Sequence, residues 1–417
     1  MNDTTAAGTT AASTAPAGPT IWLVATLALL SAVSPLATDM YLPAFPQMQD
    51  DLGTTAASVQ LTLTAFMVGL ALGQLVIGPL SDALGRRGPL LIGTIVCLAA
   101  SIACVLAPNV TVLVVMRFVQ GMSGAAGIVL SRAVITDMTR GARTARLMSL
   151  MMVLGGLMPA LAPSIGGGIL AVGDWRTIFL VVCALVGVMV VLVVVVVPES
   201  LPAGRRGSGG LRRLVVGAGE VLRNRTYLFA TGVFTLGFAA FFGYISASPF
   251  VLQNILGLGE LQYAVVFGVN SLGIMATGGL AMRLAGRVPI LSVVGVGLAL
   301  LAAGAVALLV LALVGPTLVP TLVAMFVVAA SIGLFMGNSS AIAMQALTSS
   351  AGTGSAVLGA AQFLLAGLIS PIVGINGEDD AVPMGLVLVV GSALAWVSYL
   401  ALRREPAGSD RTTTNLA

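Results

Sequence analysis

The strongest constraint on this chain is a series of long apolar runs that recur along its length with almost no charge inside them. Of its 417 residues, 58% are hydrophobic and 8% are charged, and the mean hydropathy is +1.07. A water-soluble domain has roughly 25% charged residues, so this chain lacks the polar surface that water requires. A membrane-spanning helix needs about 20 apolar residues, and its backbone groups must pair within the helix. Each run is therefore expected to be a transmembrane helix.

The runs predict an all-α membrane protein with twelve transmembrane helices. The first 20 residues are polar and carry neither the basic region nor the short apolar core of a secretory signal, so a disordered tail followed by a retained helix is expected. The expected spans are Ile21–Leu42, Ala57–Leu80, Pro89–Ala107, Thr111–Asp137, Leu147–Val172, Thr177–Val197, Tyr227–Val251, Leu261–Met282, Pro289–Val314, Leu318–Leu347, Gly354–Ile375 and Val382–Leu402.

The arginines lie almost entirely in the loops on one side of these spans. The opposite side holds only Arg176, and Arg117 and Arg132 fall within spans. Basic loops stay in the cytoplasm, so both termini are expected to be cytoplasmic. The basic balance then reflects topology and does not indicate nucleic-acid binding. The basic side holds Arg86, Arg87, Arg140, Arg143, Arg146, Arg205, Arg206, Arg212, Arg213, Arg223, Arg225, Arg283, Arg287, Arg403, Arg404 and Arg411.

A long basic loop after the sixth span divides the chain into two pseudo-symmetric six-helix bundles. The segments Gly78–Pro89 and Gly278–Pro289 lie 200 residues apart and share five of twelve positions, which favours a duplicated half, although two Gly/Leu/Arg turns can also agree by chance. The expected parts are a cytoplasmic tail (1–20), an N-terminal bundle (21–197), a cytoplasmic basic linker (198–226), a C-terminal bundle (227–402) and a cytoplasmic tail (403–417).

Two charged residues inside the apolar runs are candidate functional groups, because a charge at the centre of a bilayer costs about 2.5–3.5 kcal/mol. Arg117 lies about 10 Å into the fourth span. Asp39 lies late in the first span. A carboxyl group in a partly dry cavity, with an arginine near but not locked to it, can exchange its proton near neutral pH. The alternatives are an arginine satisfied by backbone carbonyls and an aspartate that marks the outer interface.

Enzyme chemistry has little support in the composition. The chain contains no His, which excludes imidazole bases and His-ligated metals, and its three cysteines lie inside apolar runs. Cys97 and Cys104 are about 10 Å apart along one helix, too far for a disulfide, so all three are interpreted as packing residues. Neither a metal nor a cofactor is expected.

The stretch "GPLSDALGRRGPL" after the second span is the most specific motif. Gly78 and Gly85 permit close helix approach and a tight turn. Asp82 can interact with a neighbouring helix N-terminus, and Arg86 and Arg87 belong to the basic face. The pattern resembles the signature loop of the major facilitator superfamily, with an ordinary basic turn as the alternative.

Other stretches resemble proton-coupled drug exporters of that superfamily. "TDMYLPAFP" and "MRFVQGMSGAAG" resemble the motifs of helices one and four. "LAPSIGG" resembles the antiporter motif of helix five through Pro163, Gly166 and Gly167, although Ala162 replaces its first glycine. "YISASPFVLQ" and "GTGSAVLGAAQF" resemble the bicyclomycin/chloramphenicol-resistance branch. The resemblance extends from about Ile21 to Leu402.

The resemblance implies roles for particular residues. Asp39 would face the central cavity and take part in proton coupling, and Arg117 would influence its protonation. Ser31 stands where some relatives carry a second carboxylate, so coupling would rest on Asp39 alone. A cytoplasmic gate and relay, which would latch the two halves together in one access state, is assigned to Gly78, Asp82, Gly85, Arg86, Arg87, Arg132 and Asp137.

The substrate pocket is expected between the halves near the middle of the membrane. Few deep charges and many Met, Phe and Leu residues suit neutral or weakly polar drug-sized molecules. For each candidate, helix packing is the alternative role. The candidates are Tyr41, Met67, Gln120, Phe241, Tyr244, Asn270, Asn338 and Gln362.

These observations together predict a monomeric, multi-pass protein of the cytoplasmic membrane that exports small drug-like molecules in exchange for protons. Its partners would be the drug, protons and the lipid bilayer. An exporter or uptake facilitator for a cellular metabolite is the main alternative. A membrane enzyme or a non-transporting receptor is a more distant alternative.

Overall fold

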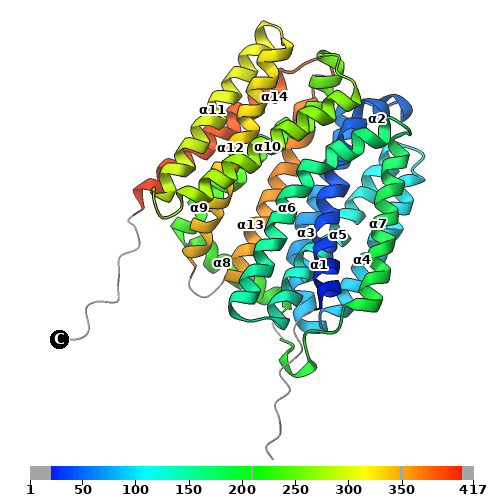
Figure 1. Ribbon diagram of the computed structural model, residues 1–417, viewed down its shortest axis with the longest axis vertical. Coiled ribbons are helices and arrows are strands. Elements are labelled where there is room, and N and C mark those ends of the chain that lie inside the picture. The colour runs from blue at the N-terminus through cyan, green and yellow to red at the C-terminus, as the bar shows by residue number, and fades with distance from the viewer. Residues whose placement is uncertain (1–19, 208–209, 348–350, 406–417) are drawn as a thin grey trace, which may run out of the picture.

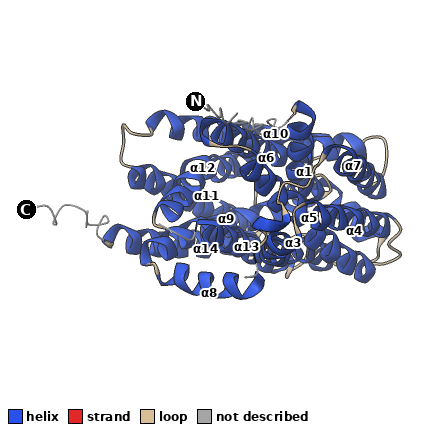
Figure 2. Ribbon diagram, turned by 90° about the horizontal axis from the view of Figure 1, so that it is seen from below, coloured by secondary structure: helices blue, strands red, loops and turns tan. Residues whose placement is uncertain are grey.

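The computed structural model describes residues 20–207, 210–347 and 351–405. Within these ranges every regular element is a helix, as Figure 2 shows. The long helices run side by side in the view of Figure 1, with short helices at their ends. The all-α class expected from the apolar runs is confirmed.

Twelve long helices form the described bundle. The first six are α1 (Ile21–Asp39), α3 (Ala56–Leu84), α4 (Arg87–Val105), α5 (Val110–Met138), α6 (Gly141–Leu170) and α7 (Trp175–Val196). The second six are α9 (Arg225–Pro249), α10 (Glu260–Leu284), α11 (Ile290–Val314), α12 (Leu318–Gln345), α13 (Ala351–Ile369) and α14 (Val382–Arg404). Eleven of them are long and apolar enough to cross a membrane, and α6 contributes the apolar segment Leu161–Leu170.

Short helices connect or extend these spans. They are η1 (Leu42–Ala44), α2 (Phe45–Asp51), η2 (Ala203–Arg205), α8 (Gly210–Arg223), the π-helical turn η3 (Phe250–Ile255) and η4 (Ser370–Gly374). The α8 helix lies within the segment predicted only as a basic linker. It contacts α3, α9 and α13, and Figure 1 shows it at the lower end of the bundle. Its 14 residues are too few to span a bilayer, and their mixture of arginines with valines and leucines suits a surface helix instead.

Several helix ends differ from the predicted spans. The α6 helix begins at Gly141, six residues before the predicted Leu147, and α3 continues to Leu84, four residues beyond the predicted Leu80. Hydropathy marks where the chain leaves the lipid, whereas a helix can continue into water. The end of α3 is determined by Gly85, whose φ of +97° is readily adopted only by glycine.

The two halves pack within themselves and meet through equivalent helices. The second helix of the first half, α3, packs against the fifth helix of the second half, α13. Reciprocally, α6 is the fifth helix of the first half and packs against α10, the second helix of the second half. This exchange is the arrangement expected for two six-helix bundles related by a pseudo-two-fold axis. The architecture predicted from the apolar runs and the repeated loop is therefore confirmed.

Small residues bring the halves close together at these two contacts. A methyl group on Gly167 would lie 2.9 Å from both the Ala264 side chain and the Glu260 carbonyl oxygen. On the other contact, the Thr64 hydroxyl donates a 2.7 Å hydrogen bond to the carbonyl oxygen of Gly367. Helices in lipid associate through close backbone approach and hydrogen bonds of this kind.

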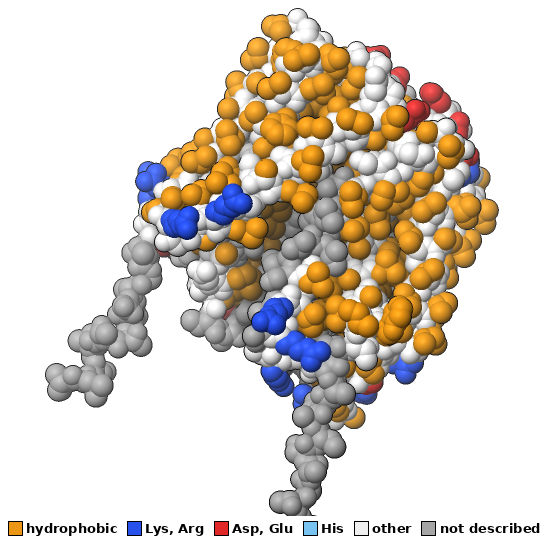
Figure 3. Space-filling view, in the orientation of Figure 1, with side chains coloured by type: hydrophobic (Ala, Val, Ile, Leu, Met, Phe, Trp, Pro, Cys, Tyr) orange, Lys and Arg blue, Asp and Glu red, His pale blue; other side chains and the backbone are white. Residues whose placement is uncertain are grey.

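The outer surface of the bundle is apolar over the length of the spans. Val195 and Val314 are each 76% exposed, and Leu313 is 66% exposed. Exposed apolar area on this scale is unfavourable in water and suits lipid. Figure 3 shows hydrophobic side chains across the visible face, with arginines toward the lower end and acidic side chains at the upper right. The protein is a multi-pass membrane protein.

The two ends of the bundle differ in charge. The Arg-rich end carries the α3–α4 loop, the start of α6 and the linker around η2, with Arg86, Arg140 and Arg205 among its residues. The Arg-poor end carries η1, α2, the start of α7 and the loop that contains Glu378. A polar contact joins the two halves at the Arg-poor end, where Gln49 of α2 donates a 2.9 Å hydrogen bond to Glu378. Glu378 also accepts a 2.7 Å bond from Asn254 of its own half.

Candidate functional site

Arg117 is buried completely in the first half. It lies on α5, eight residues after the helix-capping Asn109, and its exposed fraction is 0%. Its Nη1 donates a 2.7 Å hydrogen bond to Gln120 Oε1. The Gln120 amide in turn donates a 2.8 Å bond to the Ser101 hydroxyl on α4. The guanidinium is therefore oriented by a chain of side chains from α5 and α4.

Aromatic rings surround the same guanidinium. Its central carbon lies 4.4 Å from the ring centroids of Tyr41 and Phe66 and 5.5 Å from that of Phe179. Ring faces attract a cation, and the attraction is larger when both groups are removed from water. Among the described residues, Nε and Nη2 have no hydrogen-bond acceptor. Rings and one amide side chain hold this charge, in place of the backbone carbonyls considered from the sequence.

Asp39 is the last residue of α1 and is only 7% exposed. It is close enough to Arg117 and to Tyr263 for electrostatic interaction, but it forms no ion pair with Arg117. Tyr263 lies on α10 of the second half. The carboxyl group is therefore buried near the boundary of the two halves, with an arginine nearby that is not locked to it.

The antiporter-like motif on α6 packs against the chain next to Asp39. Gly166 lies directly against the backbone of Met40, and a methyl group there would overlap the Met40 carbonyl oxygen. Gly167 faces α10, and the neighbouring Ser164 hydroxyl donates a 3.1 Å hydrogen bond to the Ala264 carbonyl oxygen. Pro163 is buried in the same turn. This part of α6 thus contacts both the end of α1 and the second half.

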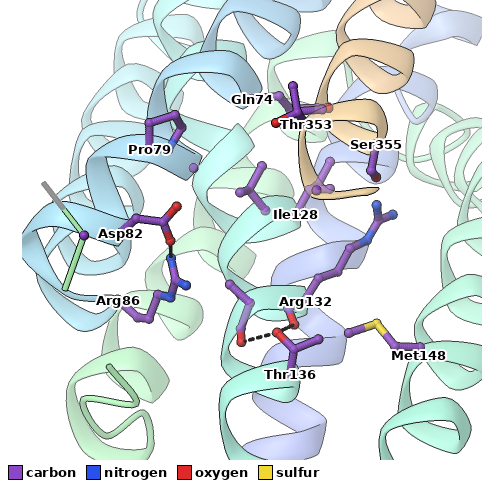
Figure 4. A pocket seen from close by; sticks show the side chains of 16 residues that line it. Gln74, Pro79, Asp82, Arg86, Ile128, Arg132, Thr136, Met148, Thr353 and Ser355 are labelled. Carbon is purple, nitrogen blue, oxygen red and sulfur yellow. Dashed lines mark hydrogen bonds and ion pairs between the residues drawn. The ribbon is translucent and has the colours of Figure 1, made fainter. Parts of the chain in front are cut away.

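Three of the predicted gate residues, Asp82, Arg86 and Asp137, form a compact ion-pair cluster at the Arg-rich end. Arg86 Nη1 lies 2.5 Å from an Asp82 oxygen, and Arg86 Nε lies 3.0 Å from an Asp137 oxygen. Burial by itself would lower the pKa of Arg86, but hydrogen bonds and attraction from Asp137 and Asp82 raise it above its usual value. Figure 4 shows the Asp82–Arg86 pair. The cluster joins α3, α5 and the start of α4, all within the first half.

Glu199 and Ser200 belong to this cluster and were not predicted. Glu199 accepts hydrogen bonds from the backbone N–H groups of Arg86 at 2.8 Å and Arg87 at 3.3 Å, and lies 3.8 Å from Arg206. The Ser200 hydroxyl donates a 3.0 Å bond to the same Asp137 oxygen that Arg86 contacts.

The electrostatic balance at Glu199 favours its charged form. Burial raises the pKa of its carboxyl group, but the backbone N–H donors of Arg86, Leu201 and Arg87, together with the charge of Arg206, hold it below the usual value. Glu199 sits at the N-terminus of α4, where an anion is stabilised. The available sequence signal was an acidic residue directly after the sixth apolar run, on a side otherwise rich in arginine.

A cavity of about 540 Å³ opens between the halves at the Arg-rich end. Of the predicted gate residues, Gly78, Asp82, Arg86 and Arg132 line it. Arg87 instead donates a 2.8 Å hydrogen bond to the Val194 carbonyl oxygen. The second half contributes the first turns of α13. The residues that line the whole cavity are Gln74, Gly78, Pro79, Asp82, Arg86, Ile128, Val129, Arg132, Ala133, Thr136, Met148, Gly207, Gly352, Thr353, Ser355 and Ala356.

The predicted substrate-pocket residues lie elsewhere and fall into separate groups. Tyr41 and Gln120 contact Arg117 inside the first half, as described above. In the second half the Asn270 amide donates a 2.7 Å hydrogen bond to the Tyr244 hydroxyl, and the Phe241 ring lies 5.5 Å from the Tyr244 ring.

The other three candidates are less closely associated with one another. Met67 is buried on α3 and faces Gly367 of α13. The Asn338 amide donates a 2.7 Å hydrogen bond to the Leu334 carbonyl oxygen, and Gln362 is half-buried on α13. None of the eight predicted residues lines the 540 Å³ cavity described above.

Two six-helix bundles that meet through equivalent helices form the architecture of this membrane protein. Residues 27–371 match the sequence profile of the Major Facilitator Superfamily. This chain belongs to that superfamily, and it is a transporter and not an enzyme.

Individual relatives agree with this assignment. The "Uncharacterized MFS-type transporter YdgK" of Bacillus subtilis is 35% identical over 92% of this chain and 96% of its own length. The "Bicyclomycin resistance protein homolog" of Haemophilus influenzae is 29% identical over 90% of this chain and 96% of its own length. An inward-facing, unoccupied structure of a bacterial homolog of the human lysosomal transporter Spinster superposes with a TM-score of 0.70. That structure is 17% identical, covers 92% of this chain and 96% of its own, and so shares the fold alone.

Proposed function

We propose that this protein exports small drug-like molecules across the cytoplasmic membrane in exchange for protons. The observation that carries the proposal is the buried Asp39, which lies within electrostatic range of Arg117 without an ion pair and within electrostatic range of Tyr263 in the second half. A carboxyl group in this position can respond both to its proton and to the arrangement of the two halves. Relatives named for bicyclomycin and multidrug resistance support the substrate class.

In the proposed cycle the drug enters from the cytoplasm or the inner leaflet while Asp39 gives up its proton. Nε and Nη2 of Arg117 have no acceptor among the described residues, so their positive field would stabilise the new carboxylate. The halves then rock to the outward-facing state and release the drug. A proton from outside neutralises Asp39, which restores the inward-facing state. Gly166, packed against Met40, transmits movement of α6 to the end of α1.

The ion-pair cluster of Asp82, Arg86 and Asp137 would act as the cytoplasmic latch in this cycle. All three residues belong to the first half, and Asp82 also borders the cavity that the start of α13 closes. We propose that the cluster keeps the ends of α3, α4 and α5 rigid, so that the first half meets α13 as one surface when the gate closes.

The proposed orientation places both termini in the cytoplasm, because the arginines gather at one end of the bundle. Reporter fusions test this orientation. A fluorescent protein at either terminus should fold and fluoresce, whereas alkaline phosphatase at the same positions should stay inactive. Active phosphatase at a terminus would place that terminus outside.

Sealed inverted vesicles with a preformed pH gradient, acidic inside, test the antiport. Addition of chloramphenicol or bicyclomycin to the wild type should release protons from the vesicles. Asp39→Asn should abolish the release, whereas the control Asp379→Asn, which removes an exposed carboxylate from a loop at the Arg-poor end, should retain it. Full-rate export of a neutral drug against its gradient by Asp39→Asn would refute the proposed coupling. Silence in all three proteins would favour a different solute, such as a cellular metabolite.

A further inference from the structure

The 540 Å³ cavity at the Arg-rich end is lined by one arginine, Arg132, that takes no part in the ion-pair cluster of Asp82, Arg86 and Asp137. Arg132 lies on α5, is exposed within the cavity, and forms no ion pair or side-chain hydrogen bond with any described residue. Figure 4 shows its guanidinium directed toward Ser355 of α13 and away from the Asp82–Arg86 pair. An arginine presents several N–H donors in a planar fork that suits carboxylate and phosphate groups.

A second donor in the cavity wall is also without an acceptor. Gln74 on α3 is 7% exposed, and its Nε2 has no hydrogen-bond partner among the described residues. Its Oε1 faces Gly359 of α13, close enough that a methyl group there would lie 2.6 Å away. A buried amide N–H without an acceptor costs about 1–3 kcal/mol, so this group favours a ligand that accepts hydrogen bonds.

The wall opposite Arg132 adds donors from the second half. Thr353 and Ser355 place hydroxyl groups along the first turns of α13, and Gly352 leaves the backbone there uncovered by a side chain. The N-terminus of a helix carries partial positive charge and favours anions. The partial positive charge at the start of α13 contributes less than Arg132 and Gln74, but it also favours an anion.

The other charges that line the cavity balance each other. Asp82 is the one acidic residue in its lining, and it lies 2.5 Å from Arg86. The charge of Arg132 is therefore left uncompensated by the lining. Ile128, Val129 and Met148 form the apolar part of the wall, and the volume lies within the range of about 300–1,000 Å³ that holds small organic ligands.

We propose that this cavity is an anion-binding site that takes the carboxylate or phosphate group of a small organic molecule, with Arg132 and Gln74 as its principal donors. The site is separate from Asp39 and Arg117. Its use as a transit site for substrates on the cytoplasmic side rests on the proposed export function, but the binding itself does not. An anionic lipid headgroup and a soluble organic anion share this chemistry.

Equilibrium dialysis of the full-length protein in phosphatidylcholine nanodiscs, without a pH gradient, tests the site with 2-naphthoate and its neutral analogue 2-naphthamide. The wild type should bind 2-naphthoate about tenfold more tightly or better, because a hydrogen bond to a charged group is strong. Arg132→Gln should remove this preference and leave 2-naphthamide binding unchanged. Arg132→Lys should keep part of it, because the charge remains while the planar fork is lost. Arg287→Gln, at an exposed arginine in the α10–α11 loop, should behave as wild type.

Equal binding of the two probes by wild type, or an unchanged preference in Arg132→Gln, would overturn the proposal. If Arg132→Gln does not fold, the wild-type comparison and Gln74→Leu, which should weaken 2-naphthoate binding severalfold, still decide it. Asp39→Asn should bind 2-naphthoate as wild type does, so failure of proton coupling and failure of this site are distinguishable.

The same assay in nanodiscs that contain phosphatidylglycerol separates the two sources of the anion. Weaker 2-naphthoate binding by wild type in these discs, with no such change in Arg132→Gln, would support the site with a lipid headgroup as its occupant. Unchanged binding by wild type would support it with a soluble organic anion.

Discussion

Gly166→Ala is expected to disturb both stability and coupling, because no space exists for the added methyl group. An ideal Cβ at Gly166 would overlap the Met40 carbonyl oxygen and lie 2.7 Å from its carbon. Both are backbone atoms, so no side-chain rotation can relieve the clash. Either α6 or the end of α1 must move, and Asp39 immediately precedes Met40.

The size of the effect follows from the cost of overpacking a closely packed interface, about 1–3 kcal/mol. Gly168 offers a matched control two residues along the same helix, since a Cβ there would meet nothing within 4 Å. Because alanine favours helices by up to about 1 kcal/mol over glycine, Gly168→Ala should be neutral or slightly stabilising. The contrast therefore separates lost space from changed helix propensity.

Thermal unfolding in detergent and drug-dependent proton release in vesicles would measure the two consequences. Gly166→Ala should unfold at a lower temperature than wild type and Gly168→Ala, and should release fewer protons per drug molecule. If Gly166→Ala matched wild type in both assays, the close contact between α6 and the end of α1 would not constrain the protein, and the proposed transmission to Asp39 would be wrong.

Three further substitutions test other parts of the structure. The pKa of Glu199 is held below its usual 4.5, so its charged form should make wild type more stable than Glu199→Gln at pH 7. This advantage should disappear as the pH falls through the lowered pKa. Equal pH profiles of the thermal unfolding temperature for the two proteins would contradict this prediction. Gln120→Leu removes the 2.7 Å acceptor of buried Arg117 and should cost about 1–3 kcal/mol of stability, measured by thermal unfolding; no loss would show that the rings suffice. Glu378→Ala removes an acceptor that joins the halves at the Arg-poor end, so spin labels at positions 50 and 379 should lie farther apart on average than in wild type. An unchanged distance distribution would mean that other contacts hold the halves together at this end.

The spans and the division into halves were predictable because lipid imposes a local requirement. Each apolar run must pair its own backbone groups, so hydropathy alone locates the helices. Helix ends were predicted less well, as α6 shows by beginning at Gly141, because charged residues can continue a helix into water. The helix α8 was missed for a related reason, since a short surface helix lacks an apolar run of spanning length.

The signature loop was recognisable because its residues are close together in the sequence. Asp82 and Arg86 are four residues apart in the sequence, and the turn at Gly85 between α3 and α4 leaves their side chains 2.5 Å apart. Glu199 joins the same cluster across more than one hundred residues, through backbone N–H groups that have no sequence signature.

The apolar runs alone show that the chain lies in lipid and divides into two halves, and they place two ionisable residues, Asp39 and Arg117, where charge is costly. What surrounds those two residues follows only from how the helices pack. The rings around Arg117 come from Tyr41, Phe66 and Phe179, on separate segments of the first half. Which rings meet one guanidinium depends on the rotation and tilt of each helix against its neighbours. Lipid does not determine the rotation and tilt of a helix, because any apolar face is equally stable against lipid. Only the close packing of side chains between helices selects one arrangement.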